Sequence, residues 1–270
     1  MPELPEVETT RRGIEKHLRG KTVSDVVVRQ RQLRWPIPKS LARHLKTQTI
    51  NAVERRGKYL LVQFDRGTLM IHLGMSGSLR VLGKAVPAEK HDHFDLVLNS
   101  DKCLRLRDPR RFGAILWADN WRQHDLIKDL GPEPLGNDFN ADYLYAKSRK
   151  RKVAVKNFIM NSHIVVGVGN IYASEALFRA GVRPTRLAGK ISKLEATTLV
   201  EVSKTVLQEA IKQGGTTLRD FTASDGKPGY FKQQLAVYGR EGEPCLHCKA
   251  IIKQITIGRR ASYYCPKCQI

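Results

Sequence analysis

Residues 59–72 read YLLVQFDRGTLMIH, and they set the fold class that we expect for the first half of the chain. Two short runs rich in β-branched and aromatic residues, Tyr59–Phe64 and Leu69–His72, lie on either side of the turn sequence Asp65-Arg66-Gly67. Runs of this length, bounded by turn residues, are typical of β-strands, and a short Gly-containing connection joins antiparallel neighbours. The sequence therefore predicts two β-strands with a turn between them.

The same pattern continues on both sides of these two strands, between Thr22 and about Trp117. Turn sequences at Arg56-Gly57 and Asn99-Ser100-Asp101 separate further short apolar runs. Many short strands spaced in this way predict an all-β sandwich or barrel. The further runs are Val26–Val28, Phe94–Leu98 and Ala114–Trp117.

A helix is predicted in front of the strands, from residue 3 to about residue 18. Its prolines fall at the very start, where a missing N–H costs nothing, and Val7, Ile14 and Leu18 share one face. Helical periodicity returns in the second half of the chain, where Asn170 to Arg179 predicts one helix. A capping box, Ser192-Lys193-Leu194-Glu195, opens another.

These patterns predict an α+β protein in four parts. A β-sandwich domain with one leading helix occupies residues 1–130, and an interdomain linker rich in Gly, Pro and basic residues occupies 131–150. A helical domain follows over residues 151–235. A cysteine-rich module occupies residues 236–270.

The charge of the chain indicates its partner. The 270 residues include 47 Lys and Arg against 26 Asp and Glu, so the formal net charge is +21. Such an excess favours a polyanionic partner, although a basic surface can also serve solubility alone. We find no apolar run of about eighteen residues, and because residues 1–6 have neither the basic start nor the apolar stretch of a signal peptide, we expect none. We therefore expect no membrane partner but a cytoplasmic protein that associates with the nucleoid by binding double-stranded DNA, with an affinity that falls as salt rises.

Four of the five cysteines form two Cys-x2-Cys pairs, Cys245 with Cys248 and Cys265 with Cys268, with sixteen residues between the pairs. This spacing is typical of a four-cysteine zinc ribbon on a β-hairpin, and four thiolates leave no position for water. We therefore expect one structural Zn²⁺ ion. Two disulfides are the alternative, which a reducing compartment disfavours. Cys103 is expected to be a small buried hydrophobe.

Several motifs together resemble one family. They are the start Met1-Pro2-Glu3-Leu4-Pro5-Glu6-Val7-Glu8, Lys58, the stretch Gly167-Val168-Gly169-Asn170-Ile171-Tyr172-Ala173-Ser174-Glu175 and the four-cysteine finger. With these motifs the chain resembles formamidopyrimidine-DNA glycosylase from end to end. The resemblance implies a bifunctional DNA glycosylase and abasic-site lyase for oxidised purines such as 8-oxoguanine and formamidopyrimidines. It also implies a β-sandwich, a helix-two-turn-helix domain and a zinc finger.

The start of the chain offers a nucleophile. Removal of Met1 leaves Pro2 as a secondary amine, and at an α-amino pKa of about 7.7–8.0 roughly a tenth to a sixth of it is neutral near pH 7. Its attack on the sugar C1′ gives a Schiff base that favours β,δ-elimination of the phosphates. By resemblance Glu3 moves the protons and Glu6 holds the amine and the helix start. Alternatively, both glutamates only complement a helix N-terminus.

The resemblance also assigns phosphate contacts. Lys58 would contact phosphate and support catalysis, and Arg260 would contact phosphate and assist the second elimination. Asn170, at a predicted helix start, suits phosphate binding, although alone it is only an N-cap. His91 and Lys152 match further DNA-contact positions, and His91 could also be a simple surface residue.

Extrusion of a nucleotide leaves a gap in the stack that an enzyme must fill. Met75, Arg110 and Phe112 resemble the family's void-filling residues, and Arg110 can also contact the orphaned base. Each of them alone could merely pack its loop. The Gly-containing stretch 216–231 matches the family's lid over the extruded base.

Two alternatives stay open. An endonuclease VIII-like glycosylase shares the fold and the chemistry but prefers oxidised pyrimidines, and Leu4 and the three void fillers speak against it. A zinc-ribbon DNA-binding protein without catalysis explains the charge and the cysteines, but it does not explain Pro2 followed by Glu3 and Glu6. We expect a monomer, because one asymmetric lesion offers no two-fold symmetry to match.

Overall fold

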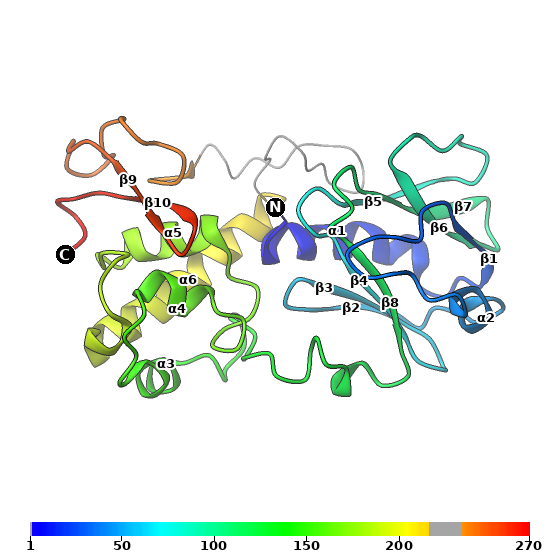
Figure 1. Cartoon of the computed structure of the whole chain (residues 1–270), viewed down its shortest axis with the longest axis horizontal. Coiled ribbons are helices and arrows are strands. Elements are labelled where there is room, and N and C mark those ends of the chain that lie inside the picture. The colour runs from blue at the N-terminus through cyan, green and yellow to red at the C-terminus, as the bar shows by residue number, and fades with distance from the viewer. Residues whose placement is uncertain (1, 216–233) are drawn as a thin grey trace. The chain divides into compact units, whose positions relative to one another are not determined.

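The computed structural model describes residues 2–215 and 234–270. These residues form two compact units (Figure 1). The first contains residues 2–128 and 213–215, and the second contains residues 129–212 and 234–270. Within the ranges described, no helix is both long enough and apolar enough to cross a membrane.

Two four-stranded antiparallel sheets form the body of the first unit. The strands are β1 (Val23–Val28), β2 (Ala52–Arg56), β3 (Tyr59–Gln63), β4 (Thr68–His72), β5 (Ser78–Gly83), β6 (Asp92–Leu98), β7 (Lys102–Arg107) and β8 (Ala114–Ala118). One sheet has the order β1-β6-β7-β5 and the other has the order β2-β3-β4-β8. The two strands predicted at residues 59–64 and 69–72 are β3 and β4, and the predicted sandwich is confirmed.

Two helices lie along the edge strands of the sandwich (Figure 1). The leading helix, α1 (Leu4–Leu18), packs against β2 and β5, each of which is the edge strand of its sheet. The short helix α2 (Leu41–Leu45) packs against the opposite edge strand β1, and its His44 stacks on Trp117 of the edge strand β8. Helices that cover sheet edges prevent pairing with other chains. A single 3-10 turn, η1 (Trp121–Gln123), follows β8.

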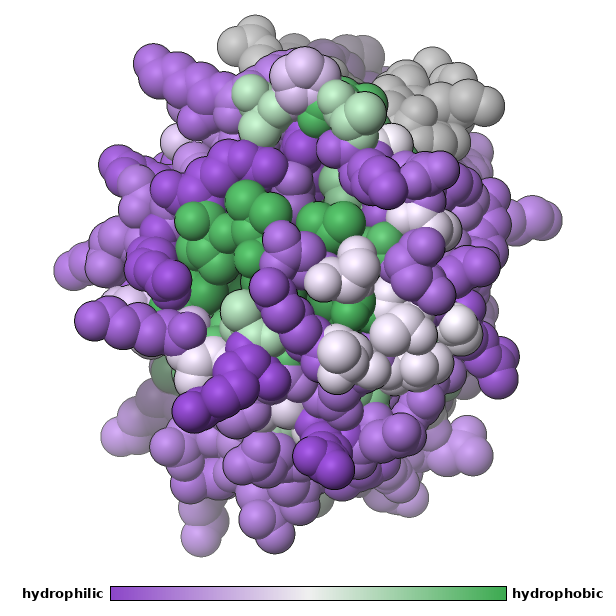
Figure 2. Space-filling view, turned by 90° about the vertical axis from the view of Figure 1, so that its right-hand side faces the viewer, coloured by the Kyte–Doolittle hydropathy of each residue, from purple (hydrophilic) through white to green (hydrophobic). Residues whose placement is uncertain are grey.

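One apolar core fills the space between the sheets and α1. The face of α1 predicted from its periodicity, Val7, Ile14 and Leu18, is at most 1% exposed and packs in one cluster with Leu60 and Leu96 of the two sheets. Each buried side chain of this size stabilises the fold by about 1.5–3 kcal/mol. Hydrophilic side chains cover most of the face seen in Figure 2, and hydrophobic ones gather mainly near its middle.

Different turns lie at the two ends of the sheet that contains β3. The turn with Lys58 joins β2 to β3, and β4 ends and β8 begins beside it, because Tyr59 pairs with His72 and His72 pairs with Ala114. The turn with Asp65 joins β3 to β4 at the opposite end. We call these the Lys58 end and the Asp65 end.

The helix α1 runs from the Lys58 end to the Asp65 end. After its last turn, the Gly20 N–H donates to the Ile50 carbonyl at 2.8 Å, and the next residue, Asn51, donates to the Gln63 carbonyl at the Asp65 end. Fifteen residues of helix span about 22 Å. The first turn of α1 is therefore placed at the Lys58 end of the unit.

Helices dominate the second unit. They are α3 (Ala141–Ser148), α4 (Val155–Met160), α5 (Asn170–Arg179) and α6 (Lys193–Lys212), with the 3-10 turn η2 (Ala188–Lys190). The helix α5 has the bounds predicted from the sequence, and α6 packs against both α3 and α5. The predicted capping box is present: the Ser192 N–H donates to the Glu195 carboxylate at 2.7 Å, and the Glu195 N–H donates to the Ser192 hydroxyl at 3.1 Å.

The segment 131–150, which we expected to be a linker, contains α3. The Asn140 side chain caps this helix by accepting the Tyr143 N–H at 2.9 Å, and Leu144 is fully buried. Because α3 packs against α6, this part of the segment belongs to the body of the second unit. The helix was not predicted because Gly, Pro and basic residues surround it, and because so short a helix buries only one face.

A β-hairpin completes the second unit. Its strands β9 (Lys253–Ile257) and β10 (Arg260–Tyr264) are joined by Gly258-Arg259, and both turn residues have positive φ, as in a type I′ turn. The buried Gln269 ties the end of the chain down: its amide donates to the Val182 carbonyl at 2.9 Å and accepts the Cys265 N–H at 2.8 Å. The hairpin is thus anchored to the helical part of its own unit.

Candidate active site and metal centre

The residues predicted to carry the chemistry lie in the first turn of α1 and directly before it. Pro2, Glu3 and Glu6 are all buried. The Glu3 N–H donates to Glu6 Oε2 at 2.8 Å, within a capping box. Gly215 lies against Glu6: its φ is +83°, and a Cβ at this position would come 3.1 Å from Glu6 Oε1. Glu6 therefore holds the helix start next to Pro2, and only a glycine fits beside it without strain.

An ion-pair network joins α1 to the turn that carries Lys58. Arg55 donates to Glu8 at 3.1 Å and to the carbonyl just before Lys58 at 2.9 Å. Glu8 also accepts hydrogen bonds from Arg11 and Arg12. Burial alone raises the pKa of Glu8, but the hydrogen bonds from these arginines outweigh burial and bring it below its ordinary value. A charged carboxylate on α1 thus fixes the position of the Lys58 turn.

The three predicted void fillers lie in two loops at the Lys58 end. Met75 is 36% exposed and Phe112 is 45% exposed, while the guanidinium carbon of the exposed Arg110 lies 5.1 Å from the centre of the Phe112 ring. The loops touch at Gly74, whose φ is +62° and where a Cβ would lie 2.3 Å from the carbonyl carbon of Phe112. The fold therefore brings Met75, Arg110 and Phe112 to one end of the unit.

His91 precedes β6 and adjoins the second of these loops. Its carbonyl accepts the Asp108 N–H at 3.0 Å, and its side chain is half-buried. His93, two residues on, is buried, with its Nε2 2.9 Å from the Asp108 carbonyl. The two histidines therefore differ in environment, and only His91 offers a partly accessible ring.

His72, the last residue of β4, is held neutral at this end. The Gly74 N–H donates to His72 Nδ1 at 3.0 Å, so this nitrogen carries no proton. Burial and the charges of Lys58 and Arg34 lower the pKa of His72 from 6.5 to about 4. Because Gly74 precedes Met75, protonation of His72 removes a hydrogen bond that orients the Met75 loop.

We expect the first unit to lose stability as the pH falls from 6.5 to about 4. In that window the unfolded chain protonates His72 and the folded chain does not, so the free energy of unfolding decreases with falling pH. Because His72 is only partly buried, we expect a loss of about 2 kcal/mol. Urea unfolding at several pH values measures it. In His72→Asn, where Oδ1 accepts the Gly74 N–H but does not titrate, the dependence should be flatter.

His124→Asn is the matched control for this exchange. His124 Nδ1 also accepts an N–H two residues on, from Leu126 at 3.2 Å. This variant should keep the pH dependence of the unaltered chain. The interpretation fails if His72→Asn loses stability with acid as steeply as the unaltered chain does.

In the second unit a buried lysine joins α5 to the β9–β10 hairpin. Lys156 of α4 is fully buried and donates to Asn170 Oδ1 at 2.6 Å, to the Ala261 carbonyl at 3.0 Å and to Ser262 Oγ at 2.5 Å. Asn170 donates to the same Ala261 carbonyl at 2.9 Å. Because Ala261 follows Arg260 in the chain, the structure places Asn170 and Arg260 on one hydrogen-bonded frame.

Replacing Lys156 with Met should loosen this frame. Three oxygens lose the Lys156 ammonium, of which the Ala261 carbonyl keeps a donor in Asn170, and each buried group left unsatisfied costs about 1–3 kcal/mol. We expect the affinity for duplex DNA to fall by about 10–100-fold, which corresponds to about 1.4–2.8 kcal/mol. Fluorescence anisotropy measures the affinity. Lys204→Met is the control, because Lys204 also donates to a distant carbonyl of this unit, that of Gly136 at 2.9 Å. Equal losses in both variants would contradict the assignment.

Lys152, the other basic residue predicted to contact DNA in this unit, lies between α3 and α4. Its side chain is exposed, and none of the contacts described above joins it to Asn170 or Arg260. The predicted lid, 216–231, lies outside the residues that the structure describes.

Glu175 fixes the segment that leads into the cysteine module. Its carboxylate accepts the backbone N–H groups of Ala236, Val237 and Tyr238 at 2.8 Å, 3.0 Å and 2.9 Å. Burial raises the pKa of Glu175, although these three hydrogen bonds act in the opposite direction. The module is therefore attached to α5 through this carboxyl group as well as through Lys156.

The four paired cysteines converge on one point. Their sulfur atoms all lie within 4.8 Å of one another, with 3.9 Å between Cys245 and Cys268 and 3.4 Å between Cys248 and Cys265. A tetrahedral zinc ion with Zn–S bonds of about 2.3 Å needs sulfur separations of about 3.8 Å. None of the five cysteines forms a disulfide in the structure, which contradicts the alternative of two disulfides. The donor set fits one structural zinc ion, and the fifth cysteine, Cys103, is buried elsewhere, as predicted.

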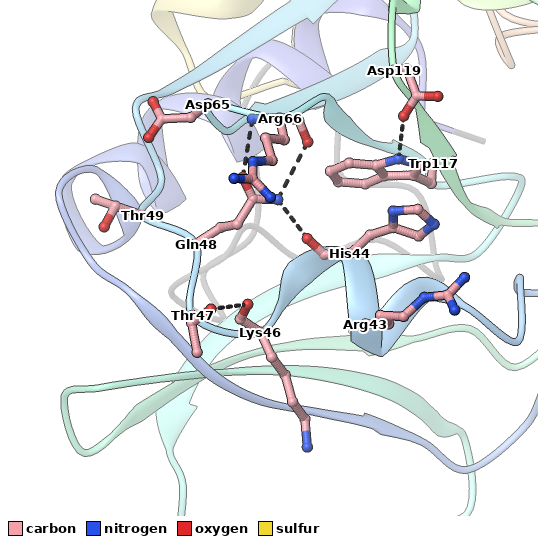
Figure 3. A pocket seen from close by; sticks show the side chains of 10 residues that line it. All are labelled: Arg43, His44, Lys46, Thr47, Gln48, Thr49, Asp65, Arg66, Trp117 and Asp119. Atoms are coloured by element: carbon pink, nitrogen blue, oxygen red, sulfur yellow. Dashed lines mark hydrogen bonds between the residues drawn. The ribbon is translucent and has the colours of Figure 1, made fainter.

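A polar pocket of about 540 Å³ lies at the Asp65 end (Figure 3). His44 stacks on Trp117 with ring centres 5.0 Å apart, and Gln48 accepts the Arg66 N–H at 3.0 Å. The length of β3, about 17 Å, separates this pocket from Lys58. None of the predicted site residues lines the pocket, so it is not part of the candidate active site.

Several residues that hold the candidate sites in place were not predicted from the sequence. Lys156 stands in the apolar helix sequence Val155–Met160, where a lysine is unexpected and could have been noticed. Glu8 and Glu175 lie within the quoted motifs, but their partners are distant in the chain. Only the fold brings Arg55 to Glu8 and residues 236–238 to Glu175.

Comparison with known families accounts for most of the chain. Residues 1–115 match the model of the formamidopyrimidine-DNA glycosylase N-terminal domain, and residues 130–222 match that of the formamidopyrimidine-DNA glycosylase H2TH domain. Residues 242–270 match the zinc finger found in FPG and IleRS. The predicted helix-two-turn-helix domain and zinc finger are thereby confirmed.

Individual proteins match over their whole length. Proteins named formamidopyrimidine-DNA glycosylase from Thioalkalivibrio sulfidiphilus and Stutzerimonas stutzeri are each 60% identical to this chain, with 100% of both chains covered. The structure of a Lactococcus lactis FPG mutant in complex with DNA containing Fapy-dG has a TM-score of 0.92 at 34% identity, covering 99% of each chain. The Thermus thermophilus MutM (FPG) structure has a TM-score of 0.89 at 37% identity, covering 99% of this chain and 98% of that one.

Proposed function

The chain belongs to the formamidopyrimidine-DNA glycosylase family, and from this premise we propose a role for each candidate site residue. It is a base-excision-repair DNA glycosylase with abasic-site lyase activity that acts on oxidised purines. Its partner is DNA that contains a damaged base or an abasic site. The observation that carries our assignment of roles is the buried start of α1, where Pro2 and Glu3 directly precede the helix and Glu6 in its first turn accepts the Glu3 N–H.

Pro2 is the nucleophile in this proposal, after removal of Met1. Its nitrogen lone pair forms a bond to C1′ of the damaged nucleotide, and the bond between C1′ and the base breaks. Ring opening gives an iminium, whose positive charge withdraws electrons and makes the C2′ proton acidic. Loss of this proton expels the 3′ phosphate, and a second elimination expels the 5′ phosphate. Water then releases Pro2 from the sugar fragment.

Glu3 is the proton carrier in this sequence, and it donates a proton to the opening sugar ring and later removes one from C2′. Its burial and its position next to Pro2 suit that role. Glu6 keeps the helix start fixed, because its carboxylate already accepts the Glu3 N–H. Lys58 binds a phosphate at the same end of the unit, held there through Arg55 and Glu8.

The second unit supplies the remaining phosphate contacts. Asn170 and Arg260 share the frame built on Lys156, so they suit neighbouring phosphates, and Arg260 assists the second elimination. His91 and Lys152 extend the contact surface. The charge of +21 supports an affinity dominated by phosphates, which weakens steeply as salt rises.

Met75, Arg110 and Phe112 fill the gap that the extruded nucleotide leaves. Two exposed apolar side chains and a guanidinium at one end of the sandwich suit a wedge that enters the base stack. Arg110 has donors for the base opposite the lesion.

The cysteine module contributes structure rather than chemistry. Zinc bound by Cys245, Cys248, Cys265 and Cys268 holds the β9–β10 hairpin, and thereby Arg260, in place.

We assign a function to each part of the chain: catalysis to residues 1–130, DNA binding to residues 151–235 with a lid at 216–231, and the zinc finger to residues 236–270. We also propose a monomer that resides in the cytoplasm, on the nucleoid.

Borohydride trapping on duplexes with one lesion tests these roles. Reduction of the Schiff base should yield a covalent adduct on the peptide that begins with Pro2, as mass spectrometry of a digest would show. Competition between 8-oxoguanine opposite cytosine and thymine glycol should favour 8-oxoguanine. Faster excision of thymine glycol would favour the endonuclease VIII-like alternative. Absence of any adduct would favour the non-catalytic zinc-ribbon protein.

A further inference from the structure

A buried hydroxyl and a buried carboxylate lie beneath the exposed wedge residues. Ser76 is 3% exposed, and its hydroxyl donates to Asp108 Oδ1 at 2.8 Å. Asp108 is completely buried, and its Oδ2 accepts the Gly113 N–H at 2.7 Å. Ser76 Oγ in turn accepts the Arg110 N–H at 3.2 Å. One pair of side chains therefore connects the loop that follows β4 with the loop that precedes β8.

The pair holds a backbone position at or next to each of the three wedge residues. Ser76 follows Met75 directly, while the Arg110 and Gly113 N–H groups border the stretch that ends in Phe112. No other hydrogen bond between side chains of the two loops is found in the described part of the chain. A neutral hydroxyl bonded to a buried charged acceptor is a strong, directional link, because charge-assisted hydrogen bonds are shorter and stronger than neutral ones.

From this geometry we infer that Ser76 and Asp108 are positioning residues for nucleotide extrusion, which make Met75, Arg110 and Phe112 enter the duplex as one rigid wedge. The inference rests on the proposed role of these three side chains. Insertion repays the cost of unstacking only if the wedge is already ordered, since ordering each flexible side chain costs about 0.5–1.5 kcal/mol. Without the link, two loops must be ordered separately at the moment of insertion.

The inference separates substrates that need a wedge from those that do not. A paired lesion in a duplex must be extruded, and Arg110 must then meet the base opposite. An abasic site in single-stranded DNA has no partner base and leaves no gap in a stack. A residue that only stabilises the fold would affect both substrates alike.

The test uses Ser76→Ala in the full-length chain. We expect single-turnover excision of 8-oxoguanine from a duplex to slow by about 10–50-fold, as for the loss of a hydrogen bond to a charged group. Borohydride trapping on single-stranded abasic DNA should stay within about twofold, because the first turn of α1 is untouched. The preference for cytosine over adenine opposite the lesion should shrink, because Arg110 loses its fixed backbone.

Two further variants make the result decisive. Ser78→Ala removes another buried hydroxyl two residues on, in β5, and should leave all three measurements unchanged. Asp108→Ala combined with Ser76→Ala should be no slower on the duplex than the slower single variant, because both remove the same link. Equal slowing on duplex and single-stranded substrates, or none on the duplex, would overturn the inference. Failure of the unaltered chain to form any adduct would instead refute the proposed function.

Discussion

A chain in which the Pro2 nitrogen is covered will bind abasic-site DNA but will not cut it. The variant carries a short, removable leader directly in front of Pro2, so that this nitrogen is an amide without a nucleophilic lone pair. We expect Schiff-base formation to slow by about 10⁴-fold or more, because a well-placed nucleophile is equivalent to about 10⁵ M or more of free amine. Borohydride trapping of end-labelled abasic DNA measures the rate.

The same preparation provides the control for the covered nitrogen. Removal of the leader with a protease that leaves Pro2 first should restore trapping. Fluorescence anisotropy should show that the covered chain still binds duplex DNA, because the phosphate contacts assigned to Asn170 and Arg260 lie in the other unit. An adduct that forms equally fast with the leader in place would show that a lysine, and not Pro2, attacks the sugar.

Features that depend on neighbouring residues were predictable from the sequence. The bounds of α5, the capping box of Ser192 and Glu195, and the strands β3 and β4 were predicted and are confirmed. All of them rest on periodicity, on N-caps or on turn residues, which act within a few positions along the chain. The cysteine spacing belongs to the same class, since each Cys-x2-Cys pair sets one edge of a tetrahedron by itself.

Features that depend on contacts between distant residues were not predictable in this way. Ser76 and Asp108 are separated by 32 positions, and Lys156 and Ser262 are separated by 106. A buried lysine and a buried aspartate look like surface residues in a sequence, because burial of a charge is favourable only where the fold supplies its partners. The resemblance in the sequence indicated which residues to propose as DNA contacts, but not which residues hold them in place.

Removal of zinc is the second change with a large expected effect. Binding of a structural zinc ion contributes about 10–16 kcal/mol, which is comparable to the stability of a whole domain. We expect a chelator, or Cys245→Ser, to unfold the β9–β10 hairpin and to lower duplex affinity and excision by about 100-fold or more. Hydrogen exchange of residues 234–270 and anisotropy titration measure the two effects. Cys103→Ala is the control, because this cysteine lies in β7, in the other unit.

The loss of structure on zinc removal should be confined to the second unit, and this distinguishes a structural zinc ion from a catalytic one. The first unit has its own apolar core and holds Pro2, Glu3 and Lys58, so amide exchange in α1 should not change when zinc is removed. Without the hairpin, however, the Ala261 carbonyl and Ser262 Oγ no longer accept hydrogen bonds from Lys156, and the frame that holds Asn170 and Arg260 is lost. Binding should therefore fail while Schiff-base chemistry at saturating abasic DNA largely survives. A zinc-free chain that binds duplex DNA as tightly as the zinc-loaded one would refute the link between hairpin and affinity.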